Sequence, residues 1–307
     1  MDGLQLLLFY KCSEMILEQR IGLLEKLGKY ILSEEPEWLQ AKESAYRENP
    51  WFIPEFIDRS CRAIAEQFLR PGLLQQIALD YQLPEKNPKS KTIGIVMAGN
   101  LPLVGFHDFC CALLCGHRLR IKPSSKDQTL ITHLARQLIA WAPSLEPAIL
   151  FSTLLKGCDA YIATGSDQSS RYFEQYFSHY PHIIRKNRTG VALLEGQEST
   201  QELLLLADDV HLYFGLGCRN VTKLFVPEGY DFIPLLESFK KYTHLSHHHK
   251  YRNNYDYQLA LLILNKQPYM TNGTILVVEN RALHAPISQL YFEYYQNRHS
   301  VLSQLQK

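Results

Sequence analysis

The sequence predicts an α/β protein built around a parallel β-sheet, followed by a second α/β domain. Short apolar stretches with strand character alternate with helical stretches of about 10–15 residues in the middle of the chain, a pattern typical of β-α-β units joined by crossovers. Before this region, apolar residues recur at helical spacing. The chain has 307 residues, which is long for a single core. About two domains are therefore expected.

The first 83 residues are predicted to be helical. Apolar side chains follow helical spacing from Ser13 to Leu32 and again from Ile53 to Leu69. Prolines at positions 36, 50 and 71 separate these stretches. The polar segment 83–90, which contains two prolines, ends this part of the chain. We expect residues 1–90 to form a helical segment that packs on the domain after it.

The sheet domain is predicted from alternating strands and helices over residues 91–195. Pro102 suits the first position of a helix, and Gly116 suits the position just after its end. Strands are expected at 92–97, 118–122, 159–163 and 191–194, and helices at 102–115, 127–141 and 167–177.

The last part of the chain, 196–307, is predicted to be a second α/β domain. It begins with a helix at 200–213, a strand at 223–226 and a helix at 231–241, and the tyrosine-rich remainder is less regular. Residues His244–Lys250 contain four histidines without a Cys or Asp at ligand spacing. We expect a solvated loop there and no metal site.

Charge, apolar runs and cysteines narrow the class of protein. The chain has 32 basic and 31 acidic residues, which gives no support for a nucleic-acid or membrane-surface partner. The apolar patch at Met1–Tyr10 lacks the basic region and cleavage site of a signal peptide. No apolar run reaches the roughly 18 residues that a membrane span needs. Seven cysteines without a Cys-x-x-Cys pair are typical of a reducing cytoplasm.

Cys218 is the candidate nucleophile. It lies in the run Tyr213–Asn220 between Gly217 and Arg219. A glycine beside the thiol lets a substrate approach, and a neighbouring guanidinium favours the thiolate that attacks carbonyl groups. The alternative is a buried structural cysteine, which is what we expect of Cys110, Cys111 and Cys115 in their apolar helix.

Three segments that follow predicted strands are candidates for ligand binding, because ligands bind at the carboxyl ends of parallel strands. Asn100 either caps the following helix or donates its amide to an oxyanion. The loop with Lys122, Ser124 and Lys126 either binds a ribose or its 2′-phosphate, or is an exposed charged loop. The turn Gly165–Ser166 either binds a pyrophosphate or is an ordinary strand-to-helix turn.

Four of these segments together resemble the aldehyde dehydrogenase superfamily. That superfamily has an Asn-Phe-Pro loop, a Gly-Asn-Thr-Val-Val-Leu-Lys-Pro strand, a Thr-Gly-Ser turn and a Gly-Gln-x-Cys nucleophile. The corresponding runs occur here in the same order, at Gly94–Leu103, Gly116–Lys126, Ala163–Ser166 and Gly217–Cys218. The blocks Pro181–Arg188 and Phe214–Val221 are more similar to the LuxC-type acyl-CoA reductases. The resemblance covers roughly residues 90–300.

The resemblance implies a doubly wound cofactor domain, an α/β catalytic domain and a role for each site residue. Cys218 resembles the nucleophile, and Asn100 with the backbone amide of Cys218 resembles the oxyanion hole. Lys122 resembles the lysine at the adenosine ribose, and Gly165 and Ser166 the turn over the pyrophosphate. NADPH is the expected cofactor because Lys122 and Lys126 flank one loop, with NADH as the alternative.

One departure from the superfamily favours reduction. Aldehyde-oxidising relatives carry a Glu in a Glu-Leu-Gly-Gly-Lys segment that activates water, whereas this chain has Ile183–Asn187 there. We therefore expect reduction of an acyl thioester, from acyl-CoA or an acylated protein, to a fatty aldehyde. The alternatives are a cysteine-dependent acyltransferase or thioesterase that needs no nicotinamide, and a non-catalytic ligand-binding member of the fold.

A second departure concerns the carboxyl end. Relatives usually continue beyond the position of Lys307 with a tail that completes the catalytic domain and supplies an oligomerisation strand. The chain is therefore expected to lack that tail, and formation of a homo-oligomer is left as an open alternative. The glutamate that commonly binds the nicotinamide ribose has no clear counterpart near Leu283–Ser288.

Overall fold

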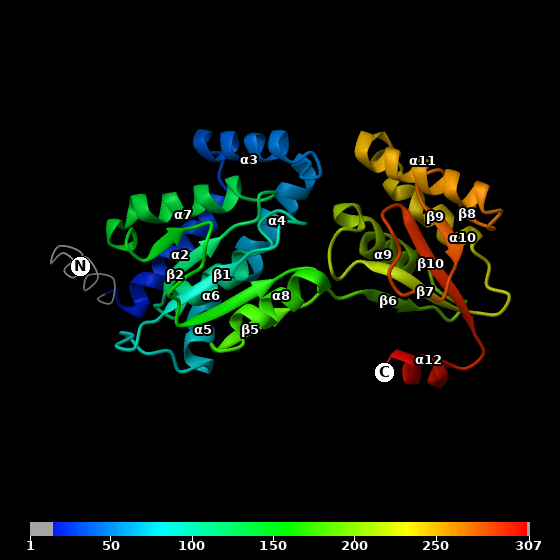
Figure 1. Cartoon of the computed structure of the whole chain (residues 1–307). Coiled ribbons are helices and arrows are strands. Elements are labelled where there is room, and N and C mark those ends of the chain that lie inside the picture. Colours follow the sequence, from blue (N-terminus) through cyan, green and yellow to red (C-terminus); the bar gives the residue numbers. More distant parts are fainter. Residues whose placement is uncertain (1–14, 306–307) are drawn as a thin grey trace. The chain divides into compact units, whose positions relative to one another are not determined.

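The computed structural model describes residues 15–305, so the apolar patch at Met1–Tyr10 lies outside the described residues. The chain divides into two compact units, Met1–Asn187 and Arg188–Lys307, each with its own sheet (Figure 1). Below they are called unit 1 and unit 2. The predicted strand near Val191 belongs to the sheet of unit 2, since it pairs with a strand from that unit.

From residue 15 onward, the described part of unit 1 starts with four helices. They are α2 (Leu17–Ile31), α3 (Pro36–Glu48), α4 (Pro54–Gln67) and α5 (Leu73–Asp80). Proline stands in the first turn of α3 and of α4, where a missing N–H leaves no hydrogen bond unmade. Trp38, Phe52 and Phe56 are fully buried, and α2 packs against α4 and against the two helices that follow the first strands. The helical segment thus shares a continuous apolar core with the sheet.

The sheet of unit 1 is entirely parallel, as predicted. Its order is β3-β2-β1-β4-β5, so the strand order reverses between β1 and β4. The strands are β1 (Thr92–Val96), β2 (Arg118–Lys122), β3 (Ile149–Phe151), β4 (Ala160–Thr164) and β5 (His182–Arg185). Both edge strands, β3 and β5, are absent from the sequence-based prediction because they are short and lack a buried apolar pattern.

Helices α6 (Phe106–Leu114), α7 (Thr129–Trp141) and α8 (Asp167–Phe177) connect these strands, with a short 3-10 turn, η1 (Pro143–Leu145), after α7. Helix α6 contacts β1 and β2, and α8 contacts β4 and β5. The predicted start of α6 at Pro102 is wrong. Leu103 has a φ of 58°, a left-handed conformation that a right-handed helix cannot contain, and the helix begins only at Phe106. Gly116 ends it with a φ of 74°, as predicted.

Gly94, inside β1, lies close to the aromatic side chains that pack between the sheet and α8. A Cβ on Gly94 would stand 2.7 Å from the ring of Tyr161 on β4. The ring stacks on Phe177 of α8, with centroids 4.1 Å apart. Glycine at position 94 therefore lets the aromatic layer under α8 lie flat against the sheet.

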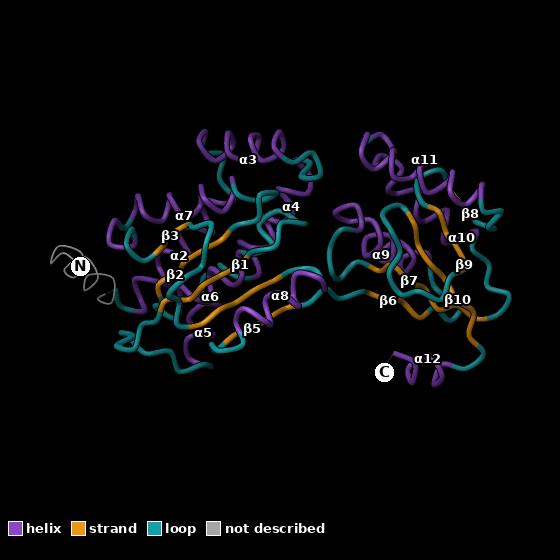
Figure 2. The backbone as a smooth tube through the Cα atoms, viewed as in Figure 1, coloured by secondary structure: helices purple, strands orange, loops and turns teal. Residues whose placement is uncertain are grey.

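Unit 2 has a sheet of order β6-β7-β10-β9-β8, parallel except for its last pair (Figure 2). The strands are β6 (Gly190–Leu193), β7 (Val221–Pro227), β8 (Met270–Thr271), β9 (Leu276–Glu279) and β10 (Gln289–Tyr295). The helices are α9 (Thr200–His211), η2 (Leu212–Gly215), α10 (Ile233–Ser238), η3 (Phe239–His247), α11 (His249–Leu264) and α12 (Arg298–Leu305).

Two expectations for this unit are wrong. The tyrosine-rich remainder is regular: Tyr255 of α11 packs with Leu276 and Val278 at β9, and Tyr251 is buried against the ring of Phe214. The histidine-rich segment is not a loop, since it spans the end of η3 and the start of α11, where the His248 side chain caps the helix. Among the described residues, no group of three or more His, Cys, Asp or Glu could hold a metal ion.

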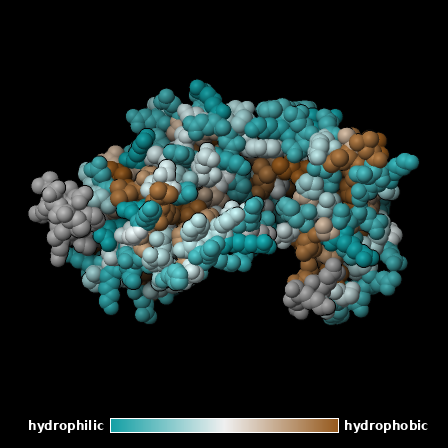
Figure 3. All heavy atoms as spheres, viewed as in Figure 1, coloured by the Kyte–Doolittle hydropathy of each residue, from teal (hydrophilic) through white to brown (hydrophobic). Residues whose placement is uncertain are grey.

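The surface in Figure 3 is mostly hydrophilic, and hydrophobic residues form small separate patches on this face. None of the helices described between residues 15 and 305 combines the length and the apolar character needed to cross a membrane.

Candidate functional site

The carboxyl ends of three strands of unit 1 meet at one edge of the sheet. Val96 pairs with Lys122 on one side and with Ala163 on the other, so β1, β2 and β4 end side by side (Figure 2). The segments that follow them carry the predicted residues Asn100, Lys122, Ser124, Lys126, Gly165 and Ser166. The reversal of strand order between β1 and β4 lies at this edge, where open α/β sheets bind their ligands.

The turn after β1 packs directly on the loop after β2. A Cβ on Gly99 would stand 2.5 Å from the Cβ of Ser124, which is closer than two carbons can approach. The Ser124 hydroxyl accepts a hydrogen bond from the N–H of Lys126 over 3.2 Å. Ser124 therefore shapes the loop and anchors it to the Gly99 turn.

A buried carboxylate supports the same turn. The N–H of Leu103 donates to Oδ2 of Asp127 over 2.7 Å, which stabilises Leu103 in its left-handed conformation. Oδ1 of Asp127 is buried and has no partner. Burial raises the pKa of Asp127 to about 7, although the bond from Leu103 works in the opposite direction. Asp127 is not among the site residues predicted from the sequence.

The two lysines of the loop are available for a ligand. Lys122 and Lys126 are exposed, and neither ammonium group forms an ion pair with another described residue. Phosphate groups bind such positions readily.

The turn after β4 opens α8. The Ser166 side chain accepts from the N–H of Ser169 over 3.3 Å and so caps the helix. A Cβ on Gly165 would stand 2.9 Å from the ring of Phe173 and 3.0 Å from the Cβ of Ser169. The close approach requires glycine here, and it leaves the first amides of α8 at the carboxyl edge of the sheet.

A salt bridge occupies the end of β5. Both Asp108 oxygens accept from Nη1 of Arg185, at 2.5 and 2.6 Å. Burial disfavours ionisation of Asp108, but hydrogen bonds from His107 and Arg185 outweigh it and lower the pKa. Lys186 forms an ion pair of 2.8 Å with Glu174. The segment Ile183–Asn187 contains no carboxylate, but the Asp108 carboxylate lies beside it, bound to Arg185.

Cys218 is exposed, free, and part of a tightly held loop in unit 2. The loop leaves α9 through η2, where Tyr213 and Phe214 have φ values of 55° and 58°. Gly215 then continues the left-handed path at 72°. Consecutive left-handed residues are strained, and surrounding contacts must hold them.

Asn220 provides those contacts. Its side-chain oxygen accepts from the N–H of Gly217 over 2.7 Å, while its amide nitrogen donates to the carbonyls of Asp209 and Leu212. A Cβ on Gly190 would stand 2.6 Å from the Asn220 carbonyl oxygen, so β6 passes directly against the loop. An Asn two residues after a cysteine in a Gly-rich turn is the signal that could have revealed this role.

The other thiols differ from the expectation in one case. Cys61, Cys110 and Cys158 are buried and Cys115 is half-buried, but Cys111 is exposed. It lies on the outer face of α6, one helical turn after His107, and its sulfur is 3.6 Å from Nε2 of that histidine. Helical periodicity turned this one cysteine of the apolar run outward.

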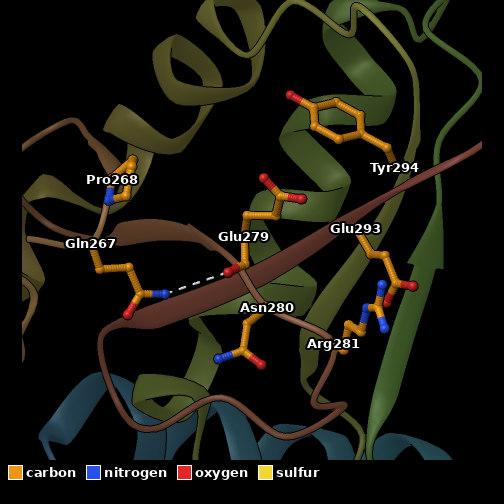
Figure 4. A pocket seen from close by; sticks show the side chains of 7 residues that line it. All are labelled: Gln267, Pro268, Glu279, Asn280, Arg281, Glu293 and Tyr294. Atoms are coloured by element: carbon orange, nitrogen blue, oxygen red, sulfur yellow. Dashed lines mark hydrogen bonds between the residues drawn. The ribbon is translucent and has the colours of Figure 1, made fainter. Parts of the chain in front are cut away.

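Unit 2 also contains a polar pocket of about 580 Å³ (Figure 4). Beneath it, the fully buried Lys223 donates to Glu293 over 2.9 Å and to the carbonyl of Asn280. Gln267 points toward the Glu279 carbonyl. The lining residues are Gln267, Pro268, Glu279, Asn280, Arg281, Glu293 and Tyr294. Such a charged wall does not suit a long apolar chain.

Comparison with known proteins identifies the fold. The chain matches an aldehyde dehydrogenase from Physcomitrella patens in complex with the reaction product succinate (12% identity, TM-score 0.70, covering 95% of this chain and 71% of that one). It also matches an NAD-dependent aldehyde dehydrogenase from Sinorhizobium meliloti (12%, 0.66, 95% and 68%). A third is the Mycobacterium tuberculosis aldehyde dehydrogenase complexed with NAD+ (12%, 0.66, 94% and 70%).

No family model and no curated protein matches the chain. The protein has the aldehyde dehydrogenase-like α/β fold, with parallel sheets and helices, as predicted. At these low identities the likeness concerns the fold. Within it, Asn100 and the loop and turn residues belong to unit 1, and Cys218 belongs to unit 2.

Proposed function

We propose that this protein is an NADPH-dependent reductase of fatty acyl thioesters, of the LuxC type, with Cys218 as nucleophile. The observation that carries the proposal is the exposed, free Cys218 in a loop held by Asn220, within an aldehyde dehydrogenase-like fold. A buried structural cysteine would not need such a loop. Acyl-CoA is the proposed donor, and an acylated protein presents the same thioester.

We assign the nicotinamide dinucleotide to the carboxyl edge of the unit 1 sheet. A Cβ on Gly99 would overlap the Ser124 side chain, and one on Gly165 would press against Phe173 and Ser169, so glycine keeps both turns tight at this edge. Lys122 and Lys126 would bind ribose or its 2′-phosphate, Ser124 would support their loop, and the amides near Ser166 would bind the pyrophosphate. When bound, the cofactor supplies the hydride that converts the acyl group to an aldehyde.

The protein's own part in the reaction starts at sulfur. The Cys218 thiolate attacks the thioester carbonyl, a tetrahedral oxyanion forms, and its collapse releases the coenzyme A thiolate and leaves an acyl-enzyme. The Asn100 amide and the backbone N–H of Cys218 donate to that oxyanion in the proposed site. Asn100 and Cys218 lie in different units, so their cooperation is itself part of the proposal.

Water should compete poorly for the acyl-enzyme. A positioned general base contributes about 10²–10⁴-fold to such a step. Asp108 is the carboxylate beside the Ile183–Asn187 segment, and its two oxygens are both occupied by Arg185. Its lowered pKa also makes it a weak base. Hydrolysis of the acyl-enzyme is therefore slow, which favours aldehyde over acid as the product.

The test is NADPH consumption with acyl-CoAs of graded chain length, run with the parent protein, Cys218→Ala and Cys115→Ala. We expect the parent and Cys115→Ala to reduce the thioester, and Cys218→Ala to lose at least about a thousandfold in rate. A Cys218→Ala variant as active as the parent would overturn the assignment. NADH run in parallel tests the cofactor preference.

Two further measurements separate the alternatives. Intact mass after incubation with acyl-CoA shows whether Cys218 becomes acylated, and fluorescence titration shows whether NADPH binds. Acylation without NADPH binding would indicate an acyltransferase or thioesterase. Neither acylation nor turnover would indicate a non-catalytic, ligand-binding protein.

A further inference from the structure

A second cysteine in unit 1 has the surroundings of a nucleophile. Nε2 of His107 is 3.6 Å from the exposed sulfur of Cys111, one turn further along α6. Nδ1 of the same ring is 3.6 Å from Oδ1 of Asp108. Arg185 in turn holds Asp108. A thiol, an imidazole and a carboxylate thus lie close together at the start of α6.

Both ring nitrogens of His107 lie near the Cys111 sulfur, Nε2 at 3.6 Å and Nδ1 at 4.0 Å, and Nδ1 also faces Asp108. The interactions with Asp108 and Cys111 raise the pKa of His107 to about 10, despite partial burial. The ring is therefore an imidazolium at pH 7, with a proton on each nitrogen, and its charge stabilises a Cys111 thiolate. The rings of Phe68 and His107 pack edge to face with their centroids 5.2 Å apart, which limits rotation of the imidazole.

Exposure distinguishes Cys111 from its neighbours on α6. Cys110 is buried, and burial raises its pKa far above the usual range, which keeps it a neutral thiol. Burial also raises the pKa of the half-buried Cys115. Among these three cysteines, only Cys111 is both exposed to solvent and next to a histidine ring, that of His107. Oxidation-sensitive cysteines have these two properties.

We propose that Cys111 is a peroxide-reactive thiol activated by His107, a modification site separate from the acyl chemistry assigned to Cys218. The thiol loses its proton to solvent, the His107 imidazolium stabilises the thiolate, and the sulfur attacks the terminal oxygen of a hydroperoxide. The O–O bond breaks, sulfur is oxidised to sulfenic acid, and the other oxygen leaves as water or an alcohol with the proton from His107. The peroxide is the oxidant, and no other reactant is required.

The inference is tested on the full chain with hydrogen peroxide at pH 7 and dimedone to trap sulfenic acid, followed by fragment-ion mass spectrometry that assigns the label to individual cysteines, because Cys110, Cys111 and Cys115 share one tryptic peptide. We expect Cys111 to be labelled faster than Cys110 and Cys115. His107→Gln should slow Cys111 labelling about 100-fold, the usual contribution of a positioned acid–base group. His179→Gln, which replaces an exposed histidine outside the cluster, should leave the rate unchanged.

Two outcomes would overturn the proposal. One is a Cys111 thiol that stays unlabelled in the parent protein while other thiols react. The other is an equal rate in His107→Gln. The ranking of thiols in the parent needs no variant, so it decides the matter even if a substitution disturbs folding. Turnover of acyl-CoA plays no part in the readout, so failure here is distinct from failure of the proposed function.

Discussion

The N–H of Leu103 donates to Oδ2 of Asp127 across 24 residues of sequence, over 2.7 Å. This bond joins the turn that carries Asn100 to the loop that carries Lys122 and Lys126. These two candidate binding segments are therefore held together by the Leu103–Asp127 hydrogen bond and by the close contact between Gly99 and Ser124.

Asp127 should make unit 1 less stable as pH rises. Its pKa is raised from 3.8 to about 7, so the folded state holds a proton that the unfolded state releases. That contribution is full below pH 3.8 and is lost as pH rises through 7. From pH 5 to pH 8 the loss is about 2–3 kcal/mol.

Urea unfolding of the parent and Asp127→Asn at both pH values measures this effect. The asparagine keeps an acceptor for Leu103 but does not titrate, so the pH-dependent difference should disappear. Asp80→Asn, at an exposed position, is the control. An unchanged pH profile in Asp127→Asn would show that Asp127 is ionised throughout.

Gly99→Ala should weaken cofactor binding, because the new Cβ would overlap Ser124. Overpacking of this kind costs about 1–3 kcal/mol, which corresponds to a loss of about 5- to 150-fold in affinity if the turn shifts. NADPH titration by fluorescence measures it. The double variant Gly99→Ala with Ser124→Gly should recover binding, since it removes the opposing carbon.

Gly22→Ala is the matched control for this series, because nothing lies within 4 Å of the Cβ it would add. Equal affinity for Gly99→Ala and Gly22→Ala would place the cofactor away from the Gly99 turn.

Asn220→Ala should release the Cys218 loop. It leaves the Asp209 and Leu212 carbonyls and the Gly217 N–H without their partner, at a cost of about 3 kcal/mol in unfolding free energy. We expect the reductase rate to fall while alkylation of Cys218 by iodoacetamide continues, because the thiol stays exposed. Asn265→Ala, at an exposed helix end, should change neither. A fully active Asn220→Ala would mean that the loop needs no such support.

His211 should make unit 2 sensitive to acid. Its ring is fully buried against Tyr242 and Phe239, and burial lowers its pKa from 6.5 to about 4. The unfolded state therefore binds a proton that the folded state rejects. Stability is full above pH 6.5 and falls as pH drops through 4. The loss between pH 7 and pH 4 is about 3 kcal/mol.

Denaturant unfolding of the parent and His211→Gln across this range tests the expectation, with the exposed His247→Gln as control. The slope of stability with pH should flatten only in His211→Gln. If both variants keep the parent's slope, another group causes the acid sensitivity.

Much of the fold could be predicted because its signals are local. The alternation of apolar strands and helices located β1, β2, β4, β6 and β7 along the chain, although β6 was expected in the first sheet and pairs with β7 in the second. Gly116 and Ser166 marked helix ends, one by its left-handed backbone and the other by its capping side chain. The short edge strands β3 and β5 escaped prediction, because their burial depends on a neighbouring strand more than on their own pattern.

The sequence by itself determined the parallel α/β architecture of unit 1 and the glycine-rich setting of Cys218. These follow from periodicity and from residues adjacent in the chain. Tertiary structure decided that Arg185 holds Asp108 and that Asn220 secures the Cys218 loop. The Arg185–Asp108 pair joins residues 77 positions apart, and a folded chain is what brings such residues together.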